Sequence, residues 1–125
     1  MGIFDIEPQM KFLYDENLND DAIRDIFLRR FPEYSLRKHY GSPKLKKSAF
    51  HQAYVTILPD VDSFKDGKYE YMTVDVESHE PALIRALMGY LIFDIIKGRD
   101  NGEFMSEVKR VVEEELSKRF HRVKP

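Results

Sequence analysis

The sequence contains no cysteine among its 125 residues. This absence excludes a disulfide framework, a thiolate nucleophile and a zinc site of the cysteine type. It is compatible with a reducing compartment, and we expect a cytoplasmic protein. The opening stretch MGIFDIEPQMKF has no basic n-region followed by an apolar core, so we expect no signal peptide.

The sequence also lacks a large excess of charge of either sign, because its formal net charge is only -2. A general nucleic-acid coat would need a strong positive excess, so that class is disfavoured. No serine stands in a GxSxG elbow, and the stretch HYGSPKLKK has a single glycine with no helix after it. A nucleophile elbow and a glycine-rich phosphate loop are therefore both absent, and no cofactor is implied.

What the chain does contain is enough for one domain, residues 1–125, with a core of its own. Charged residues make up 34% of the sequence and hydrophobic residues 42%. A helix is predicted after Asn19, a favoured N-cap followed by two aspartates that suit the helix N-terminus. Its apolar residues recur at helical spacing, and Pro32 ends it: Ile23, Ile26, Phe27 and Phe31.

Three strands are predicted in the middle of the chain, over residues 33–40, 48–58 and 68–78, and the run MKFLY at 10–14 suggests an edge strand before them. Strands 48–58 and 68–78 are rich in β-branched and aromatic residues. The link PDVDSFKDG between them carries turn residues, so these two strands should form an antiparallel hairpin.

Two helices are predicted to close the chain, with Gly98 ending the first and Asp100 beginning the second. On the last helix we expect ion pairs between Glu114 and Lys118 and between Glu115 and Arg119. Its apolar residues form one stripe: Phe104, Val108, Val111, Val112, Leu116 and Phe120. The expected fold is α+β, a three- to four-stranded antiparallel sheet with helices on one face, in the order (β)-α-β-β-β-α-α.

The first closing helix, HEPALIRALMGYLIFDIIKG at 79–98, is apolar on every side and carries only Arg85 and Asp94 as charges between Pro81 and Lys97. Its apolar part rises about 24 Å, short of the roughly 30 Å of a bilayer core, so we expect no membrane span. A helix that is hydrophobic all round must be covered all round. We therefore expect a homodimer with this helix at the interface, the alternative being a monomer whose helices wrap it. The predicted interface residues are Arg85, Met88, Gly89, Ile92 and Ile96.

One group of residues has the chemistry of a metal site. Asp75, Glu77 and His79 alternate, so they would project from one face of a strand and could hold a divalent cation. His51 would join them only if its strand were in register, but it shares a face with the apolar Ala53 and Val55. A solvated sheet face explains the same alternation without a metal.

A basic stretch, RKHYGSPKLKK at 37–47, holds five Lys/Arg and no acid, and we interpret it as a loop. Aromatic side chains beside lysine and arginine on a sheet can stack the bases of single-stranded nucleic acid. No RNP-like run supports this, and a helix or a partner could cover the aromatics instead. The candidate residues are Arg37, Lys38, His39, Lys44, Lys46, Lys47, Tyr54, Tyr69 and Tyr71.

Our leading hypothesis from the sequence is a small non-enzymatic protein that self-associates and acts through binding. The first alternative is a nucleic-acid or polyanion binder that uses residues 37–47. The second alternative is a metal-dependent enzyme that uses Asp75, Glu77 and His79.

Overall fold

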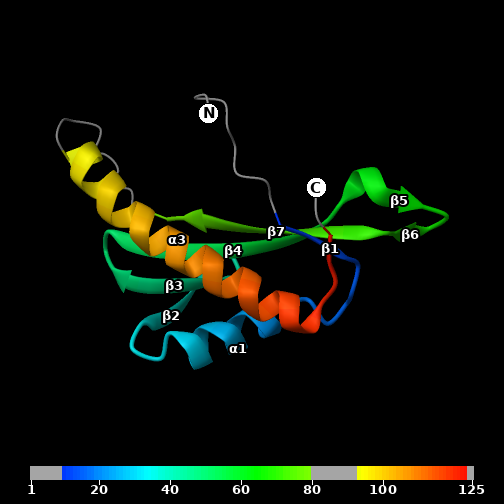
Figure 1. Cartoon of the computed structure of the whole chain (residues 1–125), viewed down its shortest axis with the longest axis horizontal. Helices are drawn as coiled ribbons and strands as arrows, with labels where there is room; N and C mark the ends of the chain where they lie inside the picture. The colour runs from blue at the N-terminus through cyan, green and yellow to red at the C-terminus, as the bar shows by residue number, and fades with distance from the viewer. Residues whose placement is uncertain (1–9, 80–92, 124–125) are drawn as a thin grey trace.

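The computed structural model describes residues 10–79 and 93–123, and for residues 93–101 only the helical backbone (Figure 1). The elements are β1 (Met10–Leu13), α1 (Asp20–Arg30), β2 (Ser35–His39), β3 (Ser42–Ser48), β4 (His51–Pro59), the 3-10 turn η1 (Val61–Ser63), β5 (Phe64–Lys65), β6 (Lys68–Tyr69), β7 (Tyr71–Ser78), α3 (Phe93–Arg119) and β8 (Arg122–Val123). The predicted α+β class is confirmed.

The main sheet has six strands in the order β2-β3-β4-β7-β1-β8, and every neighbouring pair is antiparallel. The prediction of three to four strands is wrong, and so is the predicted order in detail. Two strands were missed for different reasons. β3 contains SPKLKKS, which has a proline and no β-branched residue, while β8 is only two residues long. β1 is also not an edge strand, because it pairs with β7 and β8.

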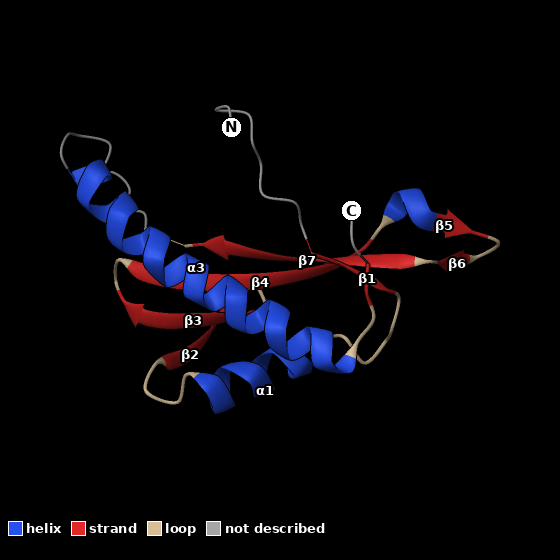
Figure 2. Ribbon diagram, in the orientation of Figure 1, coloured by secondary structure: helices blue, strands red, loops and turns tan. Residues whose placement is uncertain are grey.

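Both described helices pack on the same face of this sheet (Figure 2). Inward residues of the strands and the apolar stripes of α1 and α3 form one continuous core. The predicted stripe of the last helix is confirmed, since all six of its residues are buried. The most deeply buried large side chains include Phe12, Phe27, Leu18, Ile23, Ile26, Leu45 and Leu116.

The helix α1 begins where the sequence predicts. The side-chain oxygen of Asn19 accepts hydrogen bonds from the backbone amides of Asp21 and Ala22, at 3.1 and 3.2 Å. These two bonds satisfy N–H groups that the first helical turn leaves without a partner. Leu18 and Ile23, on either side of the cap, are both buried in the core.

The helix α3 runs without a break through residues 98–101, so the predicted end at Gly98 and new start at Asp100 are wrong. Glycine and asparagine inside a helix each cost only about 0.5–1 kcal/mol relative to alanine, and no proline interrupts this stretch. Residues 80–92, most of the predicted apolar helix, lie outside the described residues. Within the described ranges, neither helix has the length and apolar character that crossing a membrane requires.

The predicted hairpin of the two long strands is confirmed, because β4 and β7 pair in antiparallel register from Ala53–Ser78 to Pro59–Met72. Its link is more ordered than expected and contains η1 and the two-stranded ribbon β5–β6. On β7 the inward residues Met72, Val74 and Val76 are buried, and the alternate residues face the opposite side of the sheet. That opposite side is called the open face below, since neither α1 nor α3 packs on it.

Candidate functional site

The stretch predicted as a basic loop is a β-hairpin, so that prediction is wrong. Residues of β2 and β3 pair from Ser35–Lys46 to His39–Ser42. The two residues between the strands, Tyr40 and Gly41, both have positive φ, at 49° and 87°. Two-residue hairpin turns of type I′ require this at both central positions. The sequence Tyr-Gly is not the usual Asn-Gly signal of such a turn, which is why the hairpin was missed.

The strand register divides the basic residues of this hairpin between the two sides of the sheet. Arg37 pairs with Lys44, Lys44 with Tyr54, and Tyr54 with Glu77, so these residues form a row across four strands on the open face. His39 and Lys46 lie on the same side by alternation along their strands. Three cations, Arg37 and Lys44 of the row and Lys46 two residues along β3, therefore lie close together on the open face.

Two of the predicted basic residues lie on the other side. Lys38 alternates onto the side of Leu36, which packs against the core. Lys47 lies with its Nζ 5.8 Å from the ring centroid of Tyr34, which also packs against the core. The structure therefore does not bring Lys38 and Lys47 together with the other predicted binding residues.

Three planar rings meet beside the cations and are called the ring cluster: His39, Tyr54 and His79. The His39 ring centroid lies 4.2 Å from that of Tyr54 and 4.5 Å from that of His79. Lys44 Nζ lies 3.1 Å from His79 Nδ1. The cluster is half-buried and joins β2, β4 and the end of β7, which sequence spacing could not show.

The electrostatics of this region are uneven. Burial lowers the pKa of the Lys44 ammonium, and the neighbouring charges of Lys46 and Arg37 lower it further. On β7, hydrogen bonds with Tyr54 and Asp75, and the charge of His39, hold the pKa of Glu77 below its usual value against the effect of burial. Positive charge is thus concentrated on β2 and β3, and negative charge lies on the β7 side.

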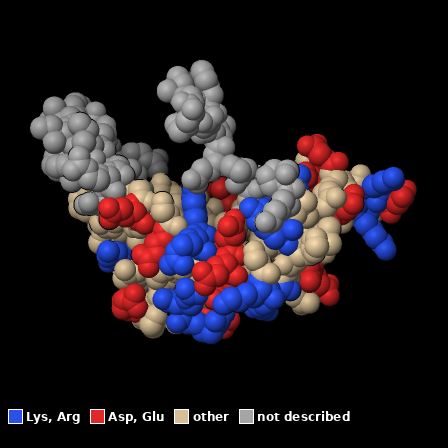
Figure 3. Space-filling view, in the orientation of Figure 1, with Lys and Arg blue, Asp and Glu red and all other residues tan. Residues whose placement is uncertain are grey.

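Most of the described cations of α1 and α3, in contrast, pair with acids. Figure 3 shows Lys/Arg and Asp/Glu side chains interleaved on the helix side of the molecule. Glu114 and Glu115 do not pair with Lys118 and Arg119 respectively, as predicted. They pair instead with other residues of α3 and with arginines of α1. The pairs are Arg29–Glu115, Arg30–Glu114, Arg30–Glu115, Arg110–Glu114 and Lys118–Glu115.

None of the ion pairs between described residues involves a basic residue of the β2–β3 hairpin. The five cations in question are Arg37, Lys38, Lys44, Lys46 and Lys47. The hairpin therefore presents positive charge that the described acids do not neutralise.

The other predicted site residues do not join this region. Tyr71 lies six residues along β7 from Glu77, about 20 Å away at the rise of a strand, and Tyr69 stacks on Tyr14 on that same distant side. His51 lies on the helix side, where Nδ1 bonds with Ser48 Oγ at 2.7 Å and its ring meets Phe104 edge-on.

The metal hypothesis gains no support from the described side chains. Asp75 and Glu77 do project from the same face of β7, as predicted. However, within residues 10–79 and 102–123 no three His, Asp or Glu side chains are placed to hold a metal ion, and this range includes Asp75, Glu77 and His79.

The predicted dimer interface is not described either. Arg85, Met88, Gly89 and Ile92 lie outside the described residues, and of Ile96 only the helical backbone is described.

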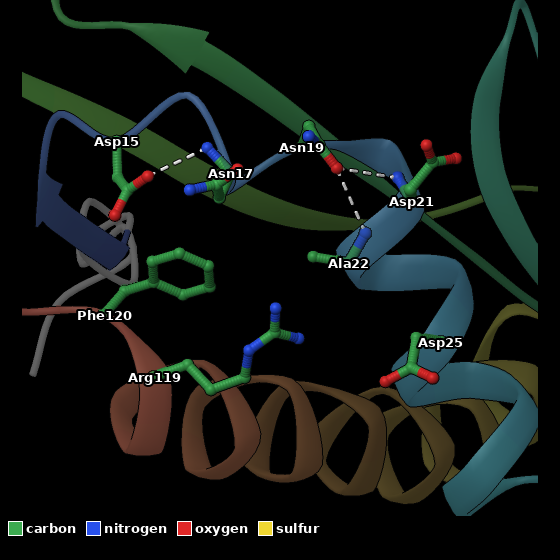
Figure 4. Close-up of a pocket in the computed structure, with 8 residues that line it drawn as sticks. All are labelled: Asp15, Asn17, Asn19, Asp21, Ala22, Asp25, Arg119 and Phe120. Atoms are coloured by element: carbon green, nitrogen blue, oxygen red, sulfur yellow. Dashed lines mark hydrogen bonds between the residues drawn. The ribbon is translucent and has the colours of Figure 1, made fainter.

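An acidic hollow of about 500 Å³ lies between the start of α1 and the end of α3 (Figure 4). Its three carboxylates already have local partners. Asp15 accepts from the backbone of Asn17, Asp21 pairs with Arg24, and Asp25 pairs with Arg29. These contacts give the residues a structural role in the turn and in α1.

No protein-family model, no curated protein and no solved structure matches the chain. Chemically, the hairpin and the ring cluster offer ammonium and guanidinium groups that no described acid neutralises, beside closely packed flat rings. Such a surface can bind phosphate groups and planar heterocycles.

Proposed function

We propose that the protein is a non-enzymatic binding protein that takes a polyanion, with nucleic acid as the favoured class, on the open face of the β2–β3 hairpin. The observation that carries the proposal is the absence of any ion pair between the five hairpin cations and the described acids. Every arginine of α1, by comparison, has an acidic partner.

Clustered cations repel one another, and repulsion from Lys46 and Arg37 adds to burial, the larger cause, in lowering the pKa of Lys44. A phosphate placed among the three would relieve it and would release the counterions condensed on the polyanion. The net charge of -2 for the whole chain does not prevent this, because the acids of α1 and α3 lie on the other side of the sheet. Binding of this kind should weaken steeply as salt is added.

The test is fluorescence anisotropy with labelled RNA and DNA over about 50 to 300 mM salt. Two double variants make a matched pair, because both remove the same charge from the same hairpin. Arg37→Gln with Lys46→Gln changes the open face, whereas Lys38→Gln with Lys47→Gln changes the opposite side. The quantity compared is the slope of the logarithm of the binding constant against the logarithm of the salt concentration. We expect the first double variant to reduce the magnitude of this slope by about 2 and the second to leave it nearly unchanged.

If the two double variants reduced the salt slope equally, only the net charge of the hairpin would matter, and the proposed site would be ruled out. No binding at the lowest salt concentration would remove the proposed function itself.

We also infer from the sequence that the chain self-associates through the apolar stretch 79–98. The supporting observation is that apolar residues surround this stretch on every side, so one small sheet cannot cover it. Size-exclusion chromatography with light scattering at micromolar concentration is the test. A single species of 14.8 kDa would overturn this inference.

A further inference from the structure

The tip of the β2–β3 hairpin carries a residue that is unfavourable there in two ways. Tyr40 has a φ of 49°, in the left-handed region that a bulky residue rarely adopts. Its side chain is also 97% exposed, so the ring gains almost nothing from burial. Asparagine or glycine would suit this turn position better. A strained and exposed aromatic side chain motivates a functional explanation.

The ring of Tyr40 is the outer end of a series of rings that leads into the sheet. It meets the His39 ring edge-on, with centroids 4.7 Å apart and planes at 75°. His39 then lies against Tyr54 and His79, the other members of the ring cluster. Arg37 and Lys44 stand beside the cluster on β2 and β3. Flat rings therefore lie together on one surface, beside cations that no described acid neutralises.

We infer that the ligand of this surface is single-stranded nucleic acid, whose unpaired bases stack on the exposed ring of Tyr40 and on His39 beside it. The inference rests on the proposed function and makes it more specific. Arg37, Lys44 and Lys46 contact the phosphates along β2 and β3, on the side away from the acids of β7.

The chemistry favours a single strand over the other polyanions. A base has two flat faces, and these are available to protein rings only when the base is unstacked. Stacking on aromatic side chains is tolerant of sequence, because every base has such a face. A duplex or an inorganic polyphosphate would engage the cations alone, and Tyr40 would contribute nothing to its binding.

An anionic membrane is the competing occupant. Interfacial anchoring also uses exposed aromatic and basic residues. The tip holds one aromatic ring followed by Gly41 and Ser42, with no further apolar residue to insert, and the half-buried rings of the cluster lie back on the sheet. The surface therefore suits flat ligands laid along it.

The experiment compares the full chain with two variants at one position. Tyr40→Phe keeps the ring, and Tyr40→Asn removes it while suiting the positive φ of the turn, so both should fold, as circular dichroism will check. The probes are a labelled single strand of about 12 nucleotides as DNA and as RNA, the duplex of the same sequence, and inorganic polyphosphate as competitor. Vesicles of phosphatidylcholine with about 30% phosphatidylserine form the last arm.

We expect Tyr40→Asn to weaken single-strand binding roughly fivefold or more and Tyr40→Phe to leave it within about twofold. Duplex and polyphosphate should bind all three proteins alike and more weakly. If single strand, duplex and polyphosphate bind equally and Tyr40→Asn changes nothing, the base-stacking inference falls and the polyanion proposal stands. If no polyanion binds, both fall. Binding to vesicles that depends on Tyr40, without binding to single strands, overturns both in favour of a membrane.

Discussion

Lys44 Nζ lies 3.1 Å from His79 Nδ1, so a residue of β3 is joined to the end of β7 across the intervening strand β4. An ammonium group can only donate, so Nδ1 of His79 is the acceptor in this contact. The contact holds the Lys44 side chain over the open face, in the row that runs from Arg37 to Glu77. An approaching phosphate is attracted by the cations of this row and repelled by its carboxylate.

Opposite charge changes in this row should change polyanion affinity in opposite directions. Lys44→Gln removes a cation from the row, and we expect about threefold to tenfold weaker binding at low salt. Glu77→Gln removes the nearby anion while keeping an acceptor for the Tyr54 hydroxyl, and we expect affinity to rise about twofold to threefold. Anisotropy titrations with one labelled single strand measure both.

Lys65→Gln is the control for this pair, since it removes the same charge from the remote β5–β6 ribbon. Its affinity should match that of the unaltered chain. A fall in affinity on Glu77→Gln, or an equal loss for Lys65→Gln and Lys44→Gln, would contradict the placement of the site.

The strained position of Tyr40 predicts that a variant can be more stable and yet bind less well. Tyr40→Asn should raise the free energy of unfolding by about 0.5–1 kcal/mol, because asparagine tolerates the left-handed region better. Gly41→Ala should lower it by a similar or larger amount, since the φ of Gly41 is 87°. Urea denaturation followed by circular dichroism gives both values. Destabilisation by Tyr40→Asn would mean that the ring supports the hairpin, and the functional argument from strain would fail.

The elements that the sequence predicted well are those whose signals are local. Asn19 and the following aspartates place the start of α1, and the apolar period places the buried stripe of α3. Alternation on β7 separates its buried valines from its polar face. The missed strand β3 has no such signal, because its strand conformation comes from pairing with β2 and β4 on either side. In the same way, cap residues near Gly98 indicate a helix end only when the packing around them favours one.

The candidate site shows the same division. Composition alone identified the basic residues of 37–47, but not which of them act together. Alternation along β2 and β3 separates Lys38 and Lys47 from Arg37, Lys44 and Lys46, so recognising the hairpin would have been enough to sort them. Predicting the ring cluster would have required the strand register between β2, β4 and β7, which pairing in the folded sheet determines. Recognising Tyr40 as a site residue would have required its positive φ, which the dipeptide Tyr-Gly indicates only weakly.

The position of β1 inside the sheet makes Phe12 a central core residue. Its side chain is completely buried, and Phe12→Ala should lower the free energy of unfolding by about 3–5 kcal/mol through lost burial and the cavity left behind. Leu28→Ala on the outer side of α1 is the comparison, because Leu28 is 59% exposed, and its effect should stay within about 0.5 kcal/mol. Chemical denaturation measures both, and a small loss for Phe12→Ala would mean that β1 is not integral to the folded sheet.

The contacts of Glu115 predict how stability changes in acid. Hydrogen bonds from Arg30, Arg29 and Lys118 lower the pKa of this buried carboxyl from 4.5 to about 2, against the opposing effect of burial. Between these two values the unfolded chain binds the proton and the folded chain does not, so stability is present above about pH 4.5 and is lost as the pH falls toward 2.

The variant Glu115→Gln removes the carboxyl that titrates, so its stability should depend less on pH over this window. Urea midpoints measured from about pH 6 to 2.5 should show the gap between the unaltered chain and the variant closing as the pH falls. Glu113→Gln is the matched control, because Glu113 pairs only with Arg122 among described residues and its side chain is 52% exposed. Its midpoints should run parallel to those of the unaltered chain. A gap for Glu115→Gln that stays constant down to the lowest pH would show that Glu115 does not hold α1 to α3 through its charge.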